Sequence, residues 1–404
     1  VAVSDPFPHT HQPPTVALVL AGGRGSRLSP LTDHRSKPAI PFAGIYRMID
    51  VALSNLAHSG LRHVWVVEQY QPFTLNQHLA GGRPWGLDGT RDGLRILPPV
   101  QGHAVDGFAS GNGHALYQQV PLLESVGARN VMVMSADHLY QLDLRPVLEQ
   151  HDELGSDLTI VTTEIDEDAS RYGVVRTDGQ KVVAYDYKPK APASQKIATE
   201  IFVFSVAALR SSLDALLEGV DRADTDAVGE TLGDYGETLI PHLVQHGGVH
   251  EFLMEGYWKD VGTVDAYYRA HMDLLEGKGL QLDAPGWAII PHPDPYAPAY
   301  IAPTAQVQGS LVAHGARVHG RVEYSVIGPG VTVEAGAVVE RSIIMGDALI
   351  PAGSHLRAVI VDVGAKVPAE QMGQIKPGPG NITVLAYEGS GQGRRFDGEA
   401  VAPA

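Results

Sequence analysis

The chain has 404 residues, of which 44% are hydrophobic and 19% are charged, and its formal net charge at pH 7 is −16. This composition excludes wholesale disorder, and the acidity argues against a general nucleic-acid binder, because phosphate backbones favour basic surfaces. The sequence contains no cysteine, which excludes disulfides, thiolate metal sites and a cysteine nucleophile.

No segment of the sequence is predicted to cross a membrane. Apolar runs stay well short of the roughly 18 residues that span a bilayer, and residues 1–14 lack a basic stretch followed by an apolar one. We therefore expect a cytoplasmic protein that binds neither membrane nor nucleic acid. Residues 1–14 and 388–404 are expected to be flexible tails.

Residues 15–282 alternate short apolar runs with amphipathic stretches. Residues 49–56 and 116–123 have apolar positions at helical spacing. Apolar strands separated by helices favour an α/β fold, a Rossmann-like and mostly parallel sheet with helices on both faces. Such sheets bind ligands at the carboxyl ends of their strands. The expected strands, all rich in β-branched residues, are residues 16–20, 64–67, 131–134, 158–161 and 201–204.

Residues 283–387 follow a different period. A six-residue period with small residues between the apolar positions is typical of a parallel β-helix with three short faces per coil. A β-sandwich with chance spacing is the alternative. We expect this domain to serve as a scaffold and an oligomerisation surface. The apolar residues at every sixth position form three groups: Ile327, Val333, Val339; Ile344, Ile350, Leu356; and Val361, Val367.

A glycine-rich loop, Ala21-Gly22-Gly23-Arg24-Gly25-Ser26-Arg27, directly follows the first expected strand. Glycines let the backbone turn tightly and present N–H groups to an anion, while arginines neutralise phosphate charge. The loop lacks the Gly-Lys-Ser/Thr ending of a P-loop, and its spacing departs from the dinucleotide fingerprint. From these residues alone, a phosphate-binding loop and a tight turn with solvated arginines both remain open.

The loop continues into Lys37-Pro38 and then into Phe-Ala-Gly-Ile-Tyr-Arg-Met-Ile-Asp-Val-Ala-Leu-Ser-Asn at residues 42–55. Here the chain resembles the sugar-1-phosphate nucleotidylyltransferases, and among them the bacterial glucose-1-phosphate adenylyltransferases. The likeness covers nearly the whole chain and implies a left-handed β-helix at its C-terminal end. It also implies Mg²⁺ as cofactor, a homotetramer, and the conversion of ATP and glucose 1-phosphate into ADP-glucose and pyrophosphate for glycogen synthesis.

The resemblance also assigns roles to matching positions. The residues that it implies for nucleotide binding are Ala21, Gly22, Gly23, Arg24, Gly25, Gln69, Gly111 and Asn112. Those that it implies for catalysis are Arg27, Lys37 and Asp137. Asp137 of Ser135-Ala-Asp-His-Leu-Tyr140 and Asp260 of Tyr257-Trp-Lys-Asp-Val-Gly-Thr263 are the implied metal ligands. The sugar phosphate is assigned to Tyr172, Gly173, Lys188 and Glu200.

The chain departs from the family pattern at the sugar site. Tyr187 precedes Lys188 where the family usually has glutamate, and Glu200 stands where glycine is usual. We expect Glu200 either to bind sugar hydroxyls or to pair with the amine of glucosamine 1-phosphate. The alternative is that Glu200 points away from the site and only the packing has changed.

The base-side motif and the effector region also differ. Residues 111–115, Gly-Asn-Gly-His-Ala, resemble the uridylyltransferases that make UDP-N-acetylglucosamine, so UTP use and a non-catalytic regulatory paralogue remain alternatives. The resemblance implies anionic metabolite effectors, which we expect near His34, Arg35 and Arg47. This binding is expected to be stronger below about pH 6.5, where a histidine side chain ordinarily gains its charge.

Overall fold

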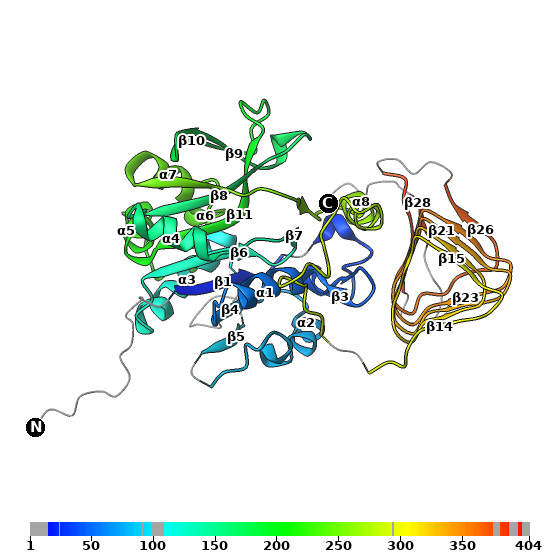
Figure 1. Ribbon diagram of the computed structural model, residues 1–404. Coiled ribbons are helices and arrows are strands. Elements are labelled where there is room, and N and C mark those ends of the chain that lie inside the picture. The colour runs from blue at the N-terminus through cyan, green and yellow to red at the C-terminus, as the bar shows by residue number, and fades with distance from the viewer. Residues whose placement is uncertain are drawn as a thin grey trace, which may run out of the picture.

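The computed structural model describes residues 15–23, 25–90, 92–98, 109–292, 295–374 and 380–387, and the backbone of 395–397. The expected tails, residues 1–14 and 388–404, lie outside the described residues apart from that short backbone stretch. Figure 1 shows an α/β body followed by a stack of β-coils. None of the helices in this described part combines the length and apolarity that membrane crossing requires.

The α/β body is built on a sheet of nine strands within the described residues, in the order β5-β4-β1-β6-β11-β8-β12-β10-β9. The strands β11 and β10 run opposite to the other seven, so the sheet is mostly parallel as expected. All five expected strands are confirmed. The nine strands are β1 Thr15–Leu20, β4 His63–Val67, β5 Gly93–Leu97, β6 Asn130–Ser135, β8 Leu158–Glu164, β9 Gly173–Asp178, β10 Lys181–Tyr187, β11 Lys196–Ser205 and β12 Val249–Leu253.

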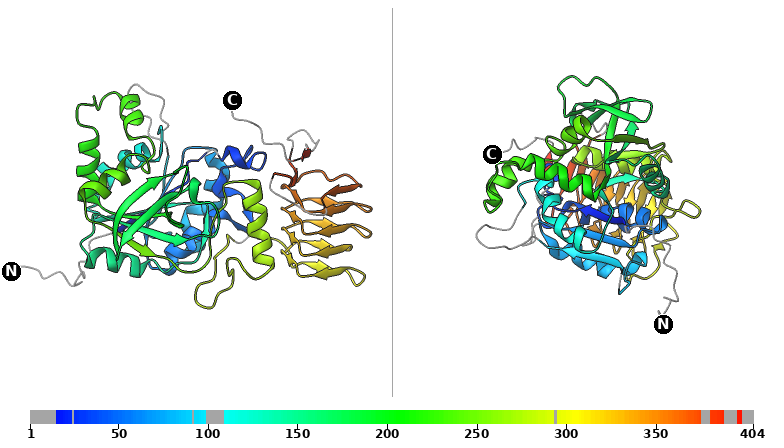
Figure 2. Two further views of the ribbon diagram at one scale, coloured as in Figure 1. Left: turned by 90° about the horizontal axis from the view of Figure 1, so that it is seen from above. Right: turned by 90° about the vertical axis from the view of Figure 1, so that its left-hand side faces the viewer.

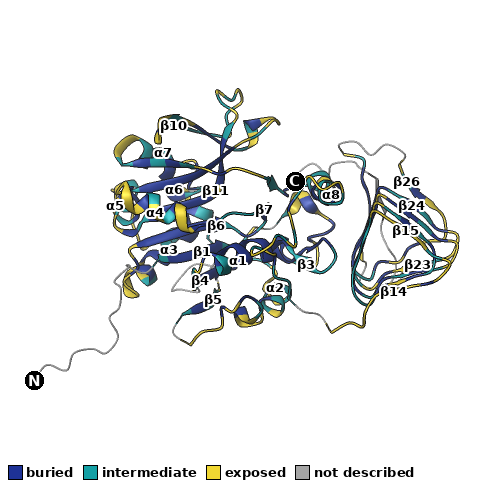
Figure 3. Ribbon diagram, viewed as in Figure 1, coloured by how far each residue is buried: buried dark blue, intermediate teal, exposed yellow. Residues whose placement is uncertain are grey.

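Helices cover both faces of this sheet. Side chains alternate between faces along a strand, so Val16 and Leu18 of β1 pack on one side while Ala17 and Val19 pack on the other. The first face is covered by α3 Asn112–Ser125, α5 Val206–Leu216, α6 Thr225–Leu232 and α7 Leu239–His246. The second face is covered by α1 Met48–His58, α2 Pro72–Leu79 and α4 Arg145–Glu153. Figure 3 shows the strands buried between these layers.

Short elements complete the α/β body at the edge where β1 and β6 end. Two small antiparallel pairs form there, β2 with β3 and β7 with β13, and the last helix, α8, leads toward the β-helix. The bounds are β2 Pro41–Phe42, β3 Tyr46–Arg47, β7 His138–Tyr140, β13 Trp258–Asp260 and α8 Val264–Leu275, with 3₁₀ turns η1 Ser26–Leu28, η2 Lys37–Ala39, η3 Ala80–Trp85 and η4 Ala169–Arg171.

The β-helix has the register that the six-residue period predicts. Ile327, Ile344 and Val361 are consecutive partners on one face, and all three are fully buried. Its strands are β14 Tyr300–Ile301, β15 Gln306–Gln308, β16 Leu311–Val312, β17 Arg317–Val318, β18 Arg321–Glu323, β19 Val326–Ile327, β20 Thr332–Val333, β21 Val338–Glu340, β22 Ile343–Ile344, β23 Leu349–Ile350, β24 His355–Arg357, β25 Val359–Val361, β26 Gln371–Gly373, β27 Thr383–Leu385 and β28 Arg395–Asp397.

The β-helix packs directly against the α/β body. Figure 2 shows its coils stacked beside α8 at one end of the molecule. The Tyr268 hydroxyl on α8 donates to the Arg341 carbonyl at 2.8 Å. An apolar core joins the two parts through Leu28, Leu31, Ile40, Phe42 and Tyr267 on one side and Val326, Ile343, Ile360 and Val384 on the other. The loop before Lys37 therefore lies against the β-helix.

Candidate active site

Three neighbouring parallel strands bring the principal predicted residues together. The strands β4, β1 and β6 are adjacent, and their carboxyl ends lead into Gln69, into the loop that begins at Ala21, and into Asp137. The Ala21 backbone N–H donates to the Val67 carbonyl at 2.9 Å, which holds the start of this loop against β4. This is the strand edge at which the sequence places a ligand site.

Lys37 lies between the two predicted metal ligands. Its ammonium forms an ion pair with Asp137 and lies 3.7 Å from Oδ1 of Asp260. The three side chains keep 11%, 16% and 18% of their surface accessible, so they are largely shielded but reachable from solvent. The Ser135 hydroxyl donates a further hydrogen bond to Asp137. The Lys37 ammonium therefore lies against the carboxylates of Asp137 and Asp260, which we call the carboxylate cluster.

These partners shift the pKa values of both ionised groups. Burial alone would raise the pKa of Asp137, but Lys37, His138 and the Ser135 hydroxyl outweigh it and hold the pKa well below its usual range. Burial would likewise lower the pKa of Lys37, yet Asp137 and Asp260 leave it raised. Both groups are therefore charged at neutral pH.

The glycine-rich loop adopts a tight turn beside this cluster. Gly25 has a φ of 65°, a backbone conformation that favours glycine, and its carbonyl accepts hydrogen bonds from Leu28 N–H and the Thr32 hydroxyl. A Cβ at Gly22 would lie only 3.0 Å from Cγ of Gln69, so the two predicted nucleotide residues are in close contact. Gly23 has open space around it, and Arg24 lies outside the described residues.

Arg27 reaches toward the second carboxylate. It is exposed on η1, and a Cβ built at Gly262 would lie 3.3 Å from its Nη2 and 3.1 Å from Oδ2 of Asp260. Its guanidinium is therefore near the carboxylate cluster, as its predicted catalytic role requires.

The prediction for Gly111 and Asn112 has less support, because both pack on the loop after α6. The Asn112 side-chain oxygen accepts from the Tyr235 N–H at 2.8 Å, and a Cβ at Gly111 would overlap the Gly233 carbonyl.

The predicted sugar-phosphate residues lie around the start of β9. The Tyr172 ring contacts the Trp258 ring edge-on, with centroids 5.5 Å apart, and the Tyr172 carbonyl accepts from the Lys188 N–H at 3.0 Å. Gly173 has no room for a side chain, because a Cβ would overlap the Tyr185 hydroxyl. The chain thus brings Tyr172, Gly173 and Lys188 together.

Tyr187 links Lys188 to a carboxylate from another part of the chain. The Lys188 ammonium donates to the Tyr187 hydroxyl and lies 4.2 Å from the centre of its ring. The Tyr187 hydroxyl in turn donates to Oδ2 of Asp234 at 2.5 Å. Asp234, on the loop after α6, therefore places a carboxylate next to position 187, where the family usually has glutamate.

Glu200 lies on β11 at a break in the strand pairing. Its φ is 58°, and the register with β8 shifts between Ala198 and Phe202. The side chain is exposed to solvent, but the surrounding protein reduces its hydration and raises its pKa. The carboxylates of Asp137 and Asp260 are close enough to contribute to this shift. The carbonyl of the preceding residue, Thr199, lies 3.1 Å from Nδ1 of His138, which places Glu200 near the carboxylate cluster.

The predicted effector residues lie at the junction with the β-helix. Nη1 of Arg35 pairs with Oδ1 of the buried Asp362 at 2.5 Å, directly after β25. The His34 ring lies edge-on to Tyr387, with centroids 6.2 Å apart. Arg47 belongs to β3 and precedes α1, where its backbone N–H donates to Asp50. Arg35 is thus engaged in an ion pair between the two parts of the protein.

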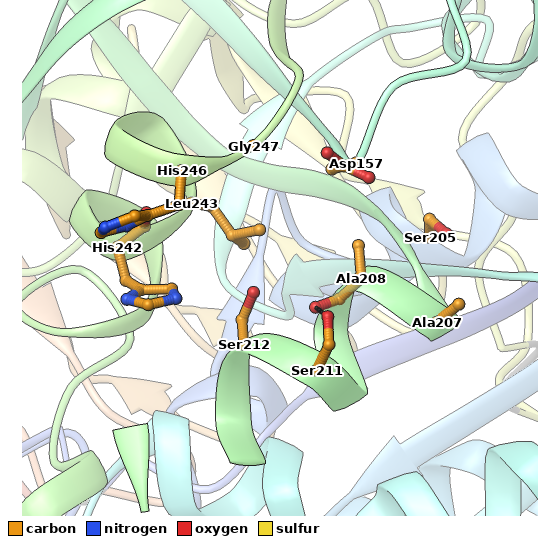
Figure 4. A pocket seen from close by; sticks show the side chains of 10 residues that line it. All are labelled: Asp157, Ser205, Ala207, Ala208, Ser211, Ser212, His242, Leu243, His246 and Gly247. Atoms are coloured by element: carbon orange, nitrogen blue, oxygen red, sulfur yellow. Dashed lines mark hydrogen bonds between the residues drawn. The ribbon is translucent and has the colours of Figure 1, made fainter. Parts of the chain in front are cut away.

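A separate pocket of about 400 Å³ lies between α5 and α7. Figure 4 shows His242 and His246 on one side and Ser211 and Ser212 on the other. The two imidazole rings are stacked, with centroids 4.5 Å apart. None of the predicted site residues lines this pocket. The carboxylate cluster at the strand ends is therefore the better candidate for the active site.

Comparison with known proteins shows which families the chain resembles. The nucleotidyl transferase family model matches residues 16–277, and the GlmU-like C-terminal hexapeptide model matches residues 300–374. The chain is 36% identical over 328 residues to the glucose-1-phosphate adenylyltransferase of Clostridium novyi (strain NT), across 80% of this chain and 84% of that protein. It is 38% identical over 330 residues to the glucose-1-phosphate adenylyltransferase of Thermotoga neapolitana, across 80% and 76%.

The chain belongs to the glucose-1-phosphate adenylyltransferase family. It is thus an enzyme, a nucleotidyltransferase, and its hexapeptide domain is a left-handed β-helix. This confirms the family and the fold class that the sequence predicts. The roles of individual residues stay predictions, which the geometry above supports to different degrees.

Sequence reasoning missed two contributors to the site. His138 follows Asp137 directly, and its Nε2 lies 3.7 Å from Oδ1 of both Asp137 and Asp260. Asp234 contacts Tyr187, which itself departs from the family pattern. His138 could have been suspected because it is part of the same motif as Asp137. Asp234 belongs to no recognisable motif, and only folding of the chain brings it next to Tyr187 on β10.

Proposed function

We propose that this enzyme makes ADP-glucose and pyrophosphate from ATP and glucose 1-phosphate. The observation that carries the proposal is Lys37 paired with Asp137 and near Asp260, at the strand ends beside the glycine-rich loop. In this reaction a sugar-phosphate dianion attacks the α-phosphate of a polyanion. Its barrier is lowered chiefly by charge neutralisation and by alignment of the reacting groups. No covalent intermediate with the protein is needed.

The carboxylates of Asp137 and Asp260 fit a magnesium ion. Both are hard oxygen donors, both stay partly accessible, and each Oδ1 lies 3.7 Å from the same histidine nitrogen. Mg²⁺ usually takes one or two carboxylates and completes its coordination with water and substrate phosphates. When bound, it would neutralise phosphate charge at the reacting centre.

The remaining residues are proposed to bind and orient the two substrates. The turn at Gly22, Gly23 and Gly25 presents backbone N–H groups to the nucleotide phosphates, and Arg27 and Lys37 supply positive charge. At the other end, Lys188 is the cation for the phosphate of the sugar. Tyr172 and Glu200 face the sugar in this proposal. Aligning both substrates in one site removes most of the entropic cost of their encounter.

One assay series tests the proposal. Pyrophosphate release is measured with each of the four nucleoside triphosphates against glucose 1-phosphate and glucosamine 1-phosphate. We expect ATP with glucose 1-phosphate to give the highest kcat/KM. A clear preference for UTP would overturn the nucleotide assignment, and no release with any pair would favour a non-catalytic regulatory paralogue.

Replacing Glu200 with glycine tests the role of this carboxylate. If Glu200 pairs with the amine of glucosamine 1-phosphate, the ratio of kcat/KM for glucosamine over glucose 1-phosphate should fall about tenfold in Glu200→Gly, because a charge-assisted hydrogen bond contributes 1.5–3 kcal/mol. Since φ is 58°, glycine also relieves strain, and Tm should not fall. Glu200→Ala, which keeps the Cβ, separates the carboxylate from the backbone effect. An unchanged preference in both variants would exclude the pairing.

We also propose that anionic metabolites regulate the enzyme near Arg35 and His34, and that it is a cytoplasmic homotetramer. The apolar side chains that the β-helix leaves exposed support self-association, among them Tyr300, Ile301, Val307 and Leu349. The exposed position of His34 on the loop before Lys37 supports the effector role.

The Arg35–Asp362 pair gives a test of this regulation. Asp362→Asn removes the charge that holds Arg35, so the half-saturating concentration of a fructose phosphate, used as an anionic probe, should fall about fivefold, the lower end of usual allosteric coupling. The control is Asp347→Asn, which changes a β-helix carboxylate bonded only by Tyr296 among the described contacts. Titration is followed by initial rate between pH 6 and 8. No response to the sugar phosphate at any pH would exclude the effector site.

A further inference from the structure

His138 occupies a position between the carboxylate cluster and the neighbouring strand. It begins β7 and is 5% exposed. Its Nδ1 lies 3.1 Å from the carbonyl oxygen of Thr199, and because a carbonyl oxygen only accepts, Nδ1 carries the proton and donates. Its Nε2 lies 3.7 Å from Oδ1 of Asp137 and 3.7 Å from Oδ1 of Asp260. One ring therefore faces both carboxylates equally.

The backbone and an aromatic contact fix this ring in place. In the antiparallel pair of β7 and β13, Asp260 lies directly opposite His138, so the strand register sets their separation. The imidazole also meets the ring of Trp258 edge-on, with centroids 5.1 Å apart. The strand pairing, Trp258 and the Thr199 carbonyl thus hold the ring, so it moves only together with these groups.

The Thr199 contact connects the ring to the sugar side of the site. Thr199 is fully buried on β11 and immediately precedes Glu200. Its hydroxyl donates to the Val161 carbonyl on β8 at 2.9 Å, so its hydroxyl and its carbonyl are both engaged. The backbone beside Glu200 is therefore hydrogen-bonded to His138, whose other ring nitrogen faces the two carboxylates.

We propose that His138 is a positioning residue that sets the spacing of Asp137 and Asp260 for a divalent cation and couples this spacing to β11. This inference rests on the proposed function, since it assumes that the carboxylates hold Mg²⁺ and that Glu200 faces the sugar phosphate. Residues that orient metal ligands commonly change metal affinity by 10–100-fold when they are replaced. His138 acts in this way through Thr199 and the two aspartates, without contacting the reacting atoms.

Three substitutions separate the two ends of the ring. In His138→Asn the amide nitrogen takes about the place of Nδ1 and keeps the bond to Thr199. In His138→Gln it takes about the place of Nε2 and keeps a polar group facing the carboxylates. His138→Phe keeps a ring against Trp258 and loses both polar contacts. Comparing the three distinguishes positioning from simple packing.

The direct readout is Mn²⁺ binding in the presence of a non-hydrolysable ATP analogue, measured by the electron paramagnetic resonance signal of free Mn²⁺ on the full chain. We expect His138→Phe to weaken Mn²⁺ binding by about tenfold or more, with the Asn and Gln variants between it and the wild type. The KM for glucose 1-phosphate should rise in the Gln and Phe variants, which lose the Thr199 bond, but not in the Asn variant.

A matched control is His151→Phe. His151 is also buried, at 2% exposure, and its Nδ1 bonds the Thr159 hydroxyl at 2.8 Å, away from the carboxylate cluster. It should lower Tm and leave Mn²⁺ binding unchanged. Wild-type Mn²⁺ affinity in all three His138 variants, or an equal loss of Mn²⁺ affinity in His151→Phe, would overturn this inference but not the proposed function. If the wild type binds neither the analogue nor Mn²⁺, the proposed function fails and the inference with it.

Discussion

Replacing Asp137 with asparagine is expected to lower kcat by roughly 10³-fold while leaving the fold intact, since one preorganised electrostatic group at a reacting centre contributes about 10²–10³ in rate. The change keeps the volume of the side chain but removes the charge that pairs with Lys37 and that suits a magnesium ion. Pyrophosphate release under saturating ATP and glucose 1-phosphate measures the effect, and thermal unfolding checks the fold.

The control for this experiment is Asp143→Asn. Asp143 lies shortly after β7 and pairs at 2.6 Å with Arg145 on the surface, so its loss should change kcat by less than about twofold. Asp137→Glu adds a second test, because it keeps the charge and moves it by one methylene. Near-normal turnover in Asp137→Asn would mean that the chemistry does not depend on this carboxylate.

The sequence predicted those parts of the fold that depend on local pattern. Five strands and two helices of the α/β body, and the register of Ile327 on Ile344 in the β-helix, follow from apolar periodicity. The strands β5, β9, β10 and β12 of the main sheet were not predicted. In β10, apolar and polar residues mix because only part of the strand is buried, so Val182 is fully covered whereas Val183 is half exposed.

The sequence predicted contacts between candidate site residues that belong to a recognisable motif, and it missed contacts that the fold alone creates. Lys37, Asp137 and Asp260 are far apart in sequence but meet as the resemblance implies. The contact of Tyr187 with Asp234 has no such signal, because it joins β10 to the loop after α6. The usual glycine at position 200 has a physical reason in the structure, since the backbone there has a φ of 58°.

Lys37→Met is expected to reduce kcat/KM by about 10²–10³-fold and to change how activity depends on pH. Methionine has a similar length but no charge to neutralise the substrate phosphates. Burial alone raises the pKa of Asp137, and Lys37 is the strongest influence that lowers it. Without Lys37 this pKa rises. Because the proposed function requires the carboxylate form of Asp137, the acidic limb of the pH–kcat profile should move to higher pH.

The pKa shifts of Asp137 and Lys37 also predict how the free energy of unfolding depends on pH. The lowered pKa of Asp137 contributes stability above its unfolded value of about 4, and the raised pKa of Lys37 contributes stability below its unfolded value of about 10. The pair therefore stabilises the wild type between these limits, and this contribution is lost as the pH falls through the folded pKa of Asp137. In Lys37→Met the loss on acidification begins at higher pH.

A matched control distinguishes this effect from the loss of any lysine. Lys259 pairs at 2.9 Å with Glu167 near the same edge of the sheet, but not with Asp137 or Asp260 in the ion pairs of the described chain. Lys259→Met should leave the acidic limb of the pH–kcat profile in place. Urea denaturation between pH 4 and 8 gives the stability arm of the comparison. An unmoved acidic limb in Lys37→Met would show that Asp137 does not control it, and the assignment of Asp137 as the essential carboxylate would then be wrong.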